Sequence, residues 1–459
     1  MMWTGQQIRH ITGGVLLGGG DSVCKGVSTD SRTIKSGELF VAIAGEQFNG
    51  HQYVKDALGR GCCGCLIHEE VDAVFDKQVQ MSVSDTLKAL GDLAHAHLQK
   101  LALPVIAVTG SNGKTGTKEI IANALSAYGS VARNPGNFNN LIGVPISAFG
   151  VDDSHDYAVL EMGMNQPGEI ARLAEIAAPK VGLVTSVACA HLEGLGSIED
   201  VARAKGELYQ SLDSDSVAVV NQNDSWAASA AVGTKARIVN VGTQSDADVV
   251  CHAIRRKGVA GLMATLHIDG KAYDLNLRGL GRHEIWNAAL AMGVVVGLGL
   301  DPEPALLAIE QGSSIGGRLQ WTVNNVGVNI IDDSYNANPG STVAALDTLV
   351  EVAAGARTIA VLGDMLELGP DAAKMHRDVA YHAADLDVDM LFCADEFSGQ
   401  MVQAFGSDKV FTVSDCSELL EVLKETVQPG DWVLIKGSRG MRMERAVVAL
   451  SDTPKPEEN

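Results

Sequence analysis

The residues with the clearest chemistry lie in a glycine-rich turn that follows an apolar run at residues 105–108. The turn contains Gly113 and Lys114, Thr115 comes next, and residues 119–128 have a helical pattern. In such a turn backbone N–H groups converge on phosphate oxygens, the helix N-terminus adds positive potential, and the lysine adds a mobile charge. The threonine hydroxyl can bind Mg²⁺. The order of strand, glycines, Lys-Thr and helix favours nucleotide phosphate binding over a turn without a ligand.

Two further polar residues follow apolar runs in the same part of the chain. Glu161 ends the run at residues 157–160, and His191 comes after the run at residues 181–185. Taken alone, a solvated glutamate and a structural histidine are the more common interpretations. Because the carboxyl ends of parallel strands meet at one edge of a sheet, these side chains and the phosphate loop together predict a Mg²⁺–ATP crevice.

Other polar groups are ambiguous from residue type alone. Lys205 lies in a helical pattern, where a solvent-facing lysine is the common interpretation. The asparagine-rich residues 134–140 could bind a ligand or only cap a turn. Arg318 and the polar residues 332–339, which end an apolar run, could face a ligand across a domain boundary.

The elements that must position these residues fall into three units. Apolar runs alternate with helical patterns over residues 104–220, which predicts a doubly wound α/β domain with a parallel sheet. Residues 249–280 alternate and turn at Asp269, which predicts a small antiparallel patch. The chain after residue 315 again alternates strands and helices in a Rossmann-like way, but no G-x-G-x-x-G follows its early strands, so no dinucleotide is predicted there.

The first 80 or so residues have short strands and helices, and leucines at helical spacing in residues 85–103 predict a helix that joins two domains. The chain is therefore expected to be α/β with three domains: a central phosphate-loop ATPase-like domain with a parallel sheet, a small N-terminal α/β domain and a Rossmann-like C-terminal domain. The predicted ranges are residues 1–84, 85–313 and 314–459.

Composition limits the class of protein. A chain of 459 residues is long enough for about three domains. Its net charge of −21 argues against a nucleic-acid or anionic-membrane surface, and 46% hydrophobic residues are ordinary for a folded chain. The N-terminus does not resemble a signal peptide, and the longest apolar run, residues 288–300, is too short to span a membrane. We expect a soluble cytoplasmic protein with a disordered polar tail at residues 451–459.

The eight cysteines suggest neither a zinc site nor a disulfide framework. Cys62, Cys63 and Cys65 lie together, but no second Cys/His pair at zinc-ligand spacing follows them. We expect these three to be small buried apolar residues. The other five are scattered singly, which suits a reducing compartment.

Taken together, these segments resemble the Mur ligase family of ATP-dependent amide-bond-forming enzymes of cell-wall synthesis, over almost the whole chain. Residues 109–115 are similar to the family's variant phosphate loop, which does without the early glycine of G-x-x-x-x-G-K-[ST] and so accounts for Val108. Three stretches resemble the family member that acts last in the series. They are residues 135–145, 332–339 and 362–369.

This resemblance implies ATP-dependent ligation of D-alanyl-D-alanine to UDP-N-acetylmuramoyl-tripeptide through an acyl phosphate. The products would be UDP-N-acetylmuramoyl-pentapeptide, ADP and phosphate, and ATP and Mg²⁺ would be required. The N-terminal domain would bind the UDP-sugar, the central domain ATP, and the C-terminal domain the dipeptide as it closes over ATP. A monomer is expected, with no nucleic-acid partner and no membrane insertion. The alternatives are the related ligase that adds the third amino acid and, in another class, a non-catalytic ATP-dependent switch.

The resemblance also assigns residues to roles. Catalytic roles fall on Lys114, Glu161, His191, Lys205 and Arg318. Nucleotide contacts fall on Gly110, Ser111, Asn112, Gly113, Lys114, Thr115, Gly116, Asn287, Arg318, Asp333, Tyr335 and Asn336. Sugar-nucleotide contacts fall on Ser28, Thr29, Asp30, Ser31, Arg32, Asn137, Asn139 and Asn140. Magnesium would be held by Thr115, Glu161, His191 and a carbamylated Lys205. One departure is Asn49, where the family commonly has aspartate.

Overall fold

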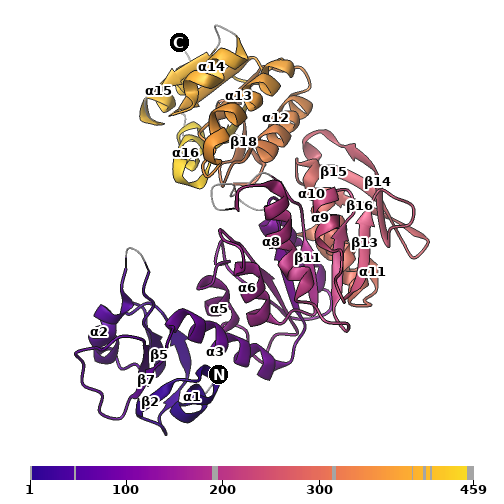
Figure 1. The fold of residues 1–459 in the computed structure, drawn as a ribbon. Coiled ribbons are helices and arrows are strands. Elements are labelled where there is room, and N and C mark those ends of the chain that lie inside the picture. Colours follow the sequence, from indigo (N-terminus) through magenta and orange to yellow (C-terminus); the bar gives the residue numbers. More distant parts are fainter. Residues whose placement is uncertain are drawn as a thin grey trace.

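The computed structural model describes residues 3–45, 48–188, 195–312, 317–394, 396–406, 410–413 and 416–451. The chain is an α/β protein with three domains, as predicted, and the first and third domains attach to different sides of the central one (Figure 1). His191, Glu193 and the tail beyond Ser451 lie outside the described residues. Within the described residues, no helix combines the length and the apolar character needed to cross a membrane.

The first domain is built on a five-stranded sheet in the order β2-β7-β6-β5-β4, parallel except for β2. Its strands are β2 (Val15–Gly18), β4 (Gly26–Ser28), β5 (Glu38–Val41), β6 (Gly64–Ile67) and β7 (Val79–Ser82). A two-stranded sheet, β1 (Trp3–Thr4) with β3 (Val23–Cys24), lies beside it, with α1 (Gly5–Thr12), η1 (Gly50–Tyr53) and α2 (Val54–Gly59).

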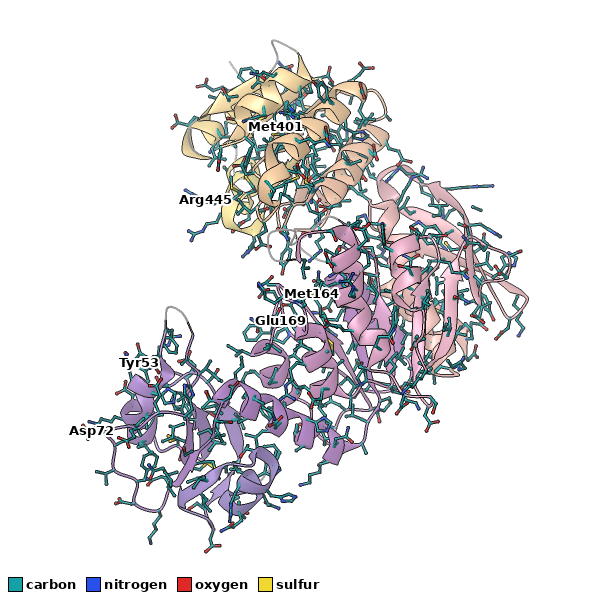
Figure 2. The ribbon with its side chains drawn as sticks, in the orientation of Figure 1. Tyr53, Asp72, Met164, Glu169, Met401 and Arg445 are labelled. Carbon is teal, nitrogen blue, oxygen red and sulfur yellow. A yellow bond between two sulfur atoms is a disulfide. The ribbon has the colours of Figure 1, made fainter. Side chains whose placement is uncertain are left out.

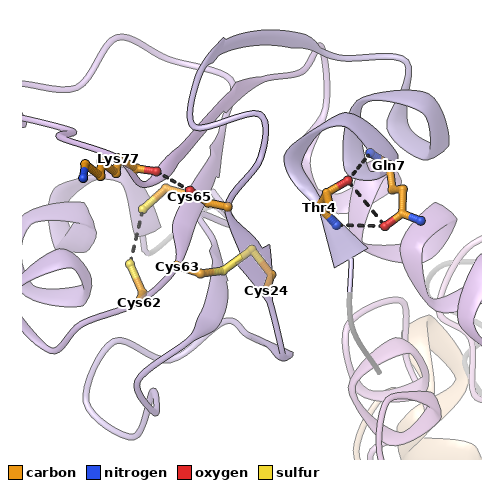
Figure 3. Close-up of a disulfide and its surroundings, with 8 residues drawn as sticks. Thr4, Gln7, Cys24, Cys62, Cys63, Cys65 and Lys77 are labelled. Carbon is orange, nitrogen blue, oxygen red and sulfur yellow. Dashed lines mark hydrogen bonds between the residues drawn. A yellow bond between two sulfur atoms is a disulfide. The ribbon is translucent and has the colours of Figure 1, made fainter.

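A disulfide in this domain corrects the expectation for the cysteines. Cys24 in β3 is bonded to Cys63, 39 residues later, just before β6 (Figure 3). The prediction of unlinked cysteines was wrong for this pair, because the strand topology, and not sequence spacing, brings their Cα atoms to 5.4 Å. Cys62 and Cys65 are buried free thiols, as expected, with their sulfur atoms 3.9 Å apart.

The central domain has a nine-stranded sheet in the order β16-β15-β14-β13-β12-β11-β8-β10-β9. Its parallel strands are β8 (Val105–Thr109), β9 (Val131–Arg133), β10 (Tyr157–Glu161), β11 (Val181–Val184), β12 (Val217–Asn221), β13 (Arg237–Gly242) and β14 (Val249–Arg256). The predicted antiparallel patch is β14 with β15 (Leu262–Ile268) and β16 (Lys271–Leu277), and it continues the parallel sheet instead of standing apart.

Helices cover both faces of this sheet, and the alternate side chains of β8, β10, β11 and β12 enter two separate apolar cores. The helices are α3 (Thr86–Leu101), α4 (Lys114–Leu125), α5 (Gly143–Ala148), α6 (Glu169–Ala177), α8 (Ile198–Gln210), α9 (Ser225–Ala230), α10 (Arg282–Gly297) and α11 (Pro302–Gln311). The long apolar run of the sequence lies in α10, a core helix, as far as Gly297. Gly293 lets α10 approach the sheet, since a Cβ there would meet the Val241 and Val219 side chains at 2.6 and 2.7 Å.

The third domain has a six-stranded sheet in the order β17-β18-β22-β19-β20-β21, parallel except for the edge strand β17. The strands are β17 (Gln320–Val323), β18 (Asn329–Asp333), β19 (Thr358–Leu362), β20 (Met390–Ala394), β21 (Val410–Val413) and β22 (Trp432–Lys436). The helices are α12 (Pro339–Ala353), α13 (Ala372–Asp385), α14 (Ser398–Phe405), α15 (Cys416–Thr426) and α16 (Glu444–Ser451). This arrangement confirms the predicted Rossmann-like alternation of strands and helices.

Candidate active site

A cavity of about 920 Å³ lies where the central and third domains meet. The phosphate loop, the ends of central strands and residues 139–142 line one side, and the segments after β18 and β22 line the other. Met164 and Glu169, which also line it, mark its central-domain side (Figure 2). Polar strand ends from two sheets therefore face one shared cavity.

The phosphate loop joins β8 to α4 directly, so the helix begins at Lys114, five residues earlier than the sequence pattern predicted. Gly113 precedes the helix in the left-handed region with φ 81°, and a Cβ there would lie 2.7 Å from Asn287 Oδ1. Both the backbone and the close approach require glycine at this position. The Lys114 ammonium donates to the Gly110 carbonyl at 2.7 Å, and burial lowers the pKa of Lys114 against the opposing charge of Glu161.

Glu161 is held in place at the end of β10, and only one of its two carboxylate oxygens accepts a hydrogen bond from the described residues. Asn134 brackets its backbone, accepting from the Glu161 N–H at 2.9 Å and donating to the Glu161 carbonyl at 3.0 Å. Asn139 Nδ2 donates to Glu161 Oε1 at 2.8 Å. Glu161 Oε2 is buried and accepts no hydrogen bond from the described residues, and its nearest cation is Lys118 Nζ at 4.0 Å. Such an oxygen is costly to bury unless a cation approaches it.

Two buried lysines of the central domain, Lys118 and Lys205, differ in their partners. Lys118 donates to the Asn134 carbonyl at 2.8 Å and pairs with Glu119 Oε1 at 3.1 Å. Lys205, on α8, is 2% exposed and has no hydrogen bond or ion pair with any residue that the structure describes. Burial, followed by the charge of Lys114, holds the pKa of Lys205 well below its ordinary value. The solvent-facing interpretation of Lys205 is wrong, and its side chain is suited to act as a neutral amine.

The third domain reaches the phosphate loop through two side chains. Arg318 Nη2 donates to Thr115 Oγ1 at 3.0 Å, and the guanidinium lies 4.4 Å from the centre of the Tyr335 ring. Asn338 Nδ2 donates to Asn112 Oδ1 at 2.5 Å. Residues more than 200 positions apart in the chain therefore meet at the start of α4.

Asp333 and Lys436 form a buried ion pair beside these contacts. They end the neighbouring strands β18 and β22, where they are paired in register. Lys436 Nζ donates to Asp333 Oδ2 at 2.5 Å and to the Asn336 carbonyl at 2.8 Å. The pair fixes the direction of the Asp333 carboxylate, which lines the cavity.

Several cavity residues were not identified from the sequence. Lys436 lines the cavity and ends an apolar strand. Lys118 does not line the cavity but lies 4.0 Å from Glu161, and it follows Lys114 by four residues on one helix face, so both lysines had a positional signal. Glu284 lines the cavity at the start of α10, where burial raises its pKa to about 7. It accepts a hydrogen bond from the Gly281 N–H at 3.2 Å. Glu284 lies three residues before Asn287, so the sequence pattern around Asn287 could have identified it as a candidate site residue.

The structure brings many of the predicted residues of the central and third domains to one cavity and leaves those of the first domain apart. Gly110 and Lys205 do not line the cavity, and His191 lies outside the described residues. The predicted residues that line the cavity are Ser111, Asn112, Gly113, Lys114, Thr115, Gly116, Asn137, Asn139, Asn140, Glu161, Asn287, Arg318, Asp333, Tyr335 and Asn336. In the first domain, the predicted residues that do not line it are Ser28, which ends β4, and Thr29, Asp30, Ser31 and Arg32, which follow that strand. There Arg32 pairs with Asp30 and lowers the pKa of Asp30 to about 2.

A cluster of two histidines and a glutamate in the first domain has the residue types of a metal site. The hydrogen bonds of His51 argue against metal binding there. Ligand atoms of His51, His68 and Glu69 lie within 4.8 Å of one another. However, His51 Nδ1 donates to Asn49 Oδ1 at 2.8 Å, and His51 Nε2 accepts from the His68 N–H at 3.0 Å. Asn49, which stands where the family commonly has aspartate, also donates to Glu69 Oε2 at 3.1 Å. Both ring nitrogens of His51 are therefore already used.

Comparison with protein families matches the chain in three consecutive parts. The model of the Mur ligase family, catalytic domain, matches residues 23–98. The Mur ligase middle domain matches residues 108–295, and the Mur ligase, glutamate ligase domain, matches residues 317–439.

Curated relatives are similar over nearly their whole length. The UDP-N-acetylmuramoyl-tripeptide–D-alanyl-D-alanine ligase of Escherichia coli (strain K12) is 35% identical, over 97% of this chain and 98% of that protein. The ligase of the same name from Bacillus subtilis (strain 168) is 32% identical, over 94% of each chain.

Solved structures give the same picture. Crystal structure I of MurF from Acinetobacter baumannii has a TM-score of 0.91 at 31% identity, over 98% of this chain and 99% of that one. The MurF ligase of Thermotoga maritima in complex with ADP has a TM-score of 0.82 at 26% identity, over 94% and 97%. A UDP-N-acetylmuramoyl-L-alanyl-D-glutamate–2,6-diaminopimelate ligase has a TM-score of 0.59 at 19% identity, over 99% and 100%, and shows only a shared fold.

Proposed function

The chain belongs to the Mur ligase family, and from this premise we propose that it joins D-alanyl-D-alanine to UDP-N-acetylmuramoyl-tripeptide with ATP. The products are UDP-N-acetylmuramoyl-pentapeptide, ADP and phosphate. This is the reaction in the names of the relatives from Escherichia coli and Bacillus subtilis. The observation that carries the proposal is the meeting of Lys114, Glu161 and Arg318 in one cavity between two domains.

The nucleotide is assigned to the start of α4 and the facing edge of the third domain. The loop N–H groups and Lys114 bind the phosphates. Arg318, which donates to the Thr115 hydroxyl in the structure, donates to phosphate oxygens when the nucleotide is bound. Asn287 contacts the adenine side of the nucleotide. Asp333 contacts the ribose, and Tyr335 and Asn336 lie beside Asp333. The ADP in the Thermotoga maritima structure supports nucleotide use by this fold.

The donor atoms around Glu161 fit a magnesium ion. Glu161 Oε2 is a buried anionic oxygen without a hydrogen bond among the described residues, and Thr115 supplies a hydroxyl nearby in the same cavity. These residues, a carbamylated Lys205 and, by resemblance, His191 would hold Mg²⁺. When bound, the ion would offset the repulsion between an anionic nucleophile and the phosphates. The Glu161 carboxylate oxygen and the Thr115 hydroxyl oxygen are of the kind that Mg²⁺ prefers.

Lys205 would gain its carboxylate by adding carbon dioxide. The amine nitrogen forms a bond to the carbon of CO₂ and releases one proton, which leaves a carbamate anion. The reaction needs a neutral amine, and burial, which lowers the pKa of Lys205, favours that form.

In the first step the terminal carboxylate of the tripeptide attacks the γ-phosphate, and ADP leaves. Lys114 and Arg318 stabilise the negative charge on the transferred phosphoryl group. In the second step the amine of the dipeptide attacks the acyl carbon, and phosphate leaves from the tetrahedral intermediate. The third domain covers the acyl phosphate and keeps out water that would hydrolyse it.

Phosphate release by the purified chain tests the proposal. Full turnover should need ATP, the UDP-sugar tripeptide and D-alanyl-D-alanine together, and Lys114→Ala should abolish it. Lys100→Ala, which changes an exposed lysine at the end of α3, is the control and should keep full activity. Turnover that does not depend on the dipeptide would contradict the assignment.

The carbamate needs a separate readout. The full chain in isotopically labelled bicarbonate should show one carbamate carbon by NMR, and Lys205→Ala should lose both that signal and activity. An active Lys205→Ala variant would remove Lys205 from the mechanism.

The alternatives make different predictions. The ligase that adds the third amino acid would accept a free amino acid and a shorter UDP-sugar peptide. A non-catalytic switch would bind ATP without forming product. Product analysis with each pair of substrates separates the three.

A further inference from the structure

Four lysine and arginine side chains line the cavity among the described residues: Lys114, Arg318, Lys436 and Arg439. The proposed reaction brings three kinds of anion to them, namely the triphosphate, the carboxylate of the tripeptide and the carboxylate of the dipeptide. The dipeptide carboxylate does not react, so it needs a cation away from the phosphates.

Three of these cations are already committed. Lys114 lies in the phosphate loop on the Gly110 carbonyl. Arg318 donates to Thr115 at the start of α4. Lys436 is 2% exposed and neutralised by Asp333. None of the three offers a free charge on the outer side of the cavity.

Arg439 differs from them in exposure and in partners. It begins η4 (Arg439–Met441), directly after the segment that follows β22, and its side chain is 64% exposed. Its nearest carboxylate is Glu444 Oε2 at 3.8 Å, which is too long for a hydrogen bond. Among the described residues, its guanidinium makes no other ion pair and no hydrogen bond. Its fork of N–H donors is therefore available to a planar anion.

The position of Arg439 relative to the phosphate loop suits a dipeptide. Its guanidinium lies 5.8 Å from the centre of the Tyr335 ring, and that of Arg318 lies 4.4 Å from the same ring. The two arginines are therefore held around one aromatic side chain, Arg318 towards the phosphates. An extended dipeptide spans about 7 Å from amine to carboxylate. Because both guanidinium groups lie no more than 5.8 Å from the centre of the Tyr335 ring, a dipeptide whose amine lies on the Arg318 side is long enough for its carboxylate to approach Arg439.

The same corner also offers an apolar surface. Leu366 lines the cavity, is 46% exposed, and lies beside η4, since a Cβ at Gly440 would be 3.0 Å from Leu366 Cδ1. Small methyl side chains fit such a surface.

We propose that Arg439 binds the free carboxylate of the incoming dipeptide, with Leu366 against its methyl groups. This inference rests on the proposed function and makes Arg439 a specificity-determining residue for the second substrate. The enzyme then requires a dipeptide with a free carboxyl terminus and discriminates against its amide.

Steady-state kinetics of the full chain test the inference. Arg439→Ala should raise the KM for D-alanyl-D-alanine about 10- to 100-fold, the usual range for losing a charge-assisted hydrogen bond. The KM values for ATP and for the UDP-sugar tripeptide should not change. Arg439→Lys should keep part of the affinity, because it retains the charge without the fork. The control is Arg445→Ala, an exposed arginine on the outer side of α16 (Figure 2).

A second arm changes the ligand instead of the protein. D-alanyl-D-alaninamide, which lacks the carboxylate, should show the same loss with the wild-type chain as Arg439→Ala shows with the dipeptide. Arg439→Ala should accept the dipeptide and its amide equally well.

The outcomes separate this inference from the one on which it rests. A wild-type chain that does not use the dipeptide at all overturns both. Wild-type turnover together with an unchanged dipeptide KM in Arg439→Ala overturns only the role of Arg439. A raised KM for ATP would place Arg439 on the nucleotide and would also overturn it. Unchanged ADP binding and thermal unfolding confirm that the variant is folded.

Discussion

The central domain meets its two neighbours through different kinds of contact. Towards the first domain, one helix, α3, belongs to two apolar cores. Leu90 and Leu93 pack in the core of the first domain, and Leu98 packs in a core of the central domain. Phe149 of the central domain packs edge-on against Trp3 of the first, with ring centres 6.3 Å apart. Separating these domains would expose apolar surface to water.

Towards the third domain the contacts are mainly polar, and Leu280, just before α10, is a central-domain side chain that packs in the apolar core of the third domain. Besides Arg318 with Thr115 and Asn338 with Asn112, the Glu351 carboxylate of α12 pairs with Arg256 at 2.9 Å and Arg282 at 2.8 Å. Hydrogen bonds and ion pairs of this kind exchange with water at a small net cost. We therefore expect the third domain to open and close over the nucleotide while the first domain stays packed. The reactive cavity therefore lies at the domain boundary that can open.

The largest expected effect is on catalysis at the polar boundary. Arg318→Ala should lower kcat about 1000-fold, the scale of removing a preorganised donor to developing charge. The unfolding of the chain in urea should change little, because Arg318 contributes no apolar core contact. Rapid-mixing measurement of phosphate release gives kcat.

A kcat within a few-fold of the wild-type value would show that Arg318 does not act on the phosphates. Tyr335→Phe is a matched variant, since it keeps the ring beneath the guanidinium.

At the apolar boundary we expect a loss of stability instead. Phe149→Ala should lower the free energy of unfolding by about 3 kcal/mol, through lost burial and a cavity beside Trp3. Urea unfolding followed by tryptophan fluorescence measures it. Tyr381→Ala, which removes an exposed aromatic side chain in the third domain, should change it by less than about 0.5 kcal/mol. Equal effects of the two substitutions would mean that the first boundary is no stronger than the surface.

How far the sequence predicts this molecule depends on whether the deciding contacts are local. The hairpin turning at Asp269 was predicted, because its turn and alternation are local. Its continuation of the parallel sheet was not, because the pairing of β13 with β14 depends on the whole domain. The Cys24–Cys63 disulfide was missed for the same reason.

The site shows the same division. The phosphate loop and Glu161 could be predicted from strand ends and glycines. The burial of Lys205 could not, since it follows from how α8 packs on the sheet, and residue type alone favoured the surface. Lys436 was missed because its partner, Asp333, is 103 residues away in the chain.

The smallest effect concerns the ion pairs of the polar boundary. Hydrogen bonds from Arg282 and Arg256 lower the pKa of Glu351 from its ordinary 4.5 to about 2. A carboxyl group with a lowered pKa stabilises the folded chain above its unfolded pKa, and this contribution is lost as pH falls through the folded value. Glu351→Gln should therefore cost about 1 kcal/mol at pH 7, a small value because the side chain is 31% exposed and screened.

The pH dependence distinguishes this boundary from the apolar one. The difference in unfolding free energy between the wild-type chain and Glu351→Gln should be full at pH 7 and should shrink progressively below about pH 4.5, towards the folded pKa of about 2. High salt should reduce it at pH 7, whereas it should leave the effect of Phe149→Ala in place. Asp347→Asn is the control, because Asp347 lies on the same helix but pairs with His382 inside the third domain. If Glu351→Gln were as costly as Phe149→Ala and insensitive to salt, the second boundary would be a rigid joint, and closure over the nucleotide would have to occur elsewhere.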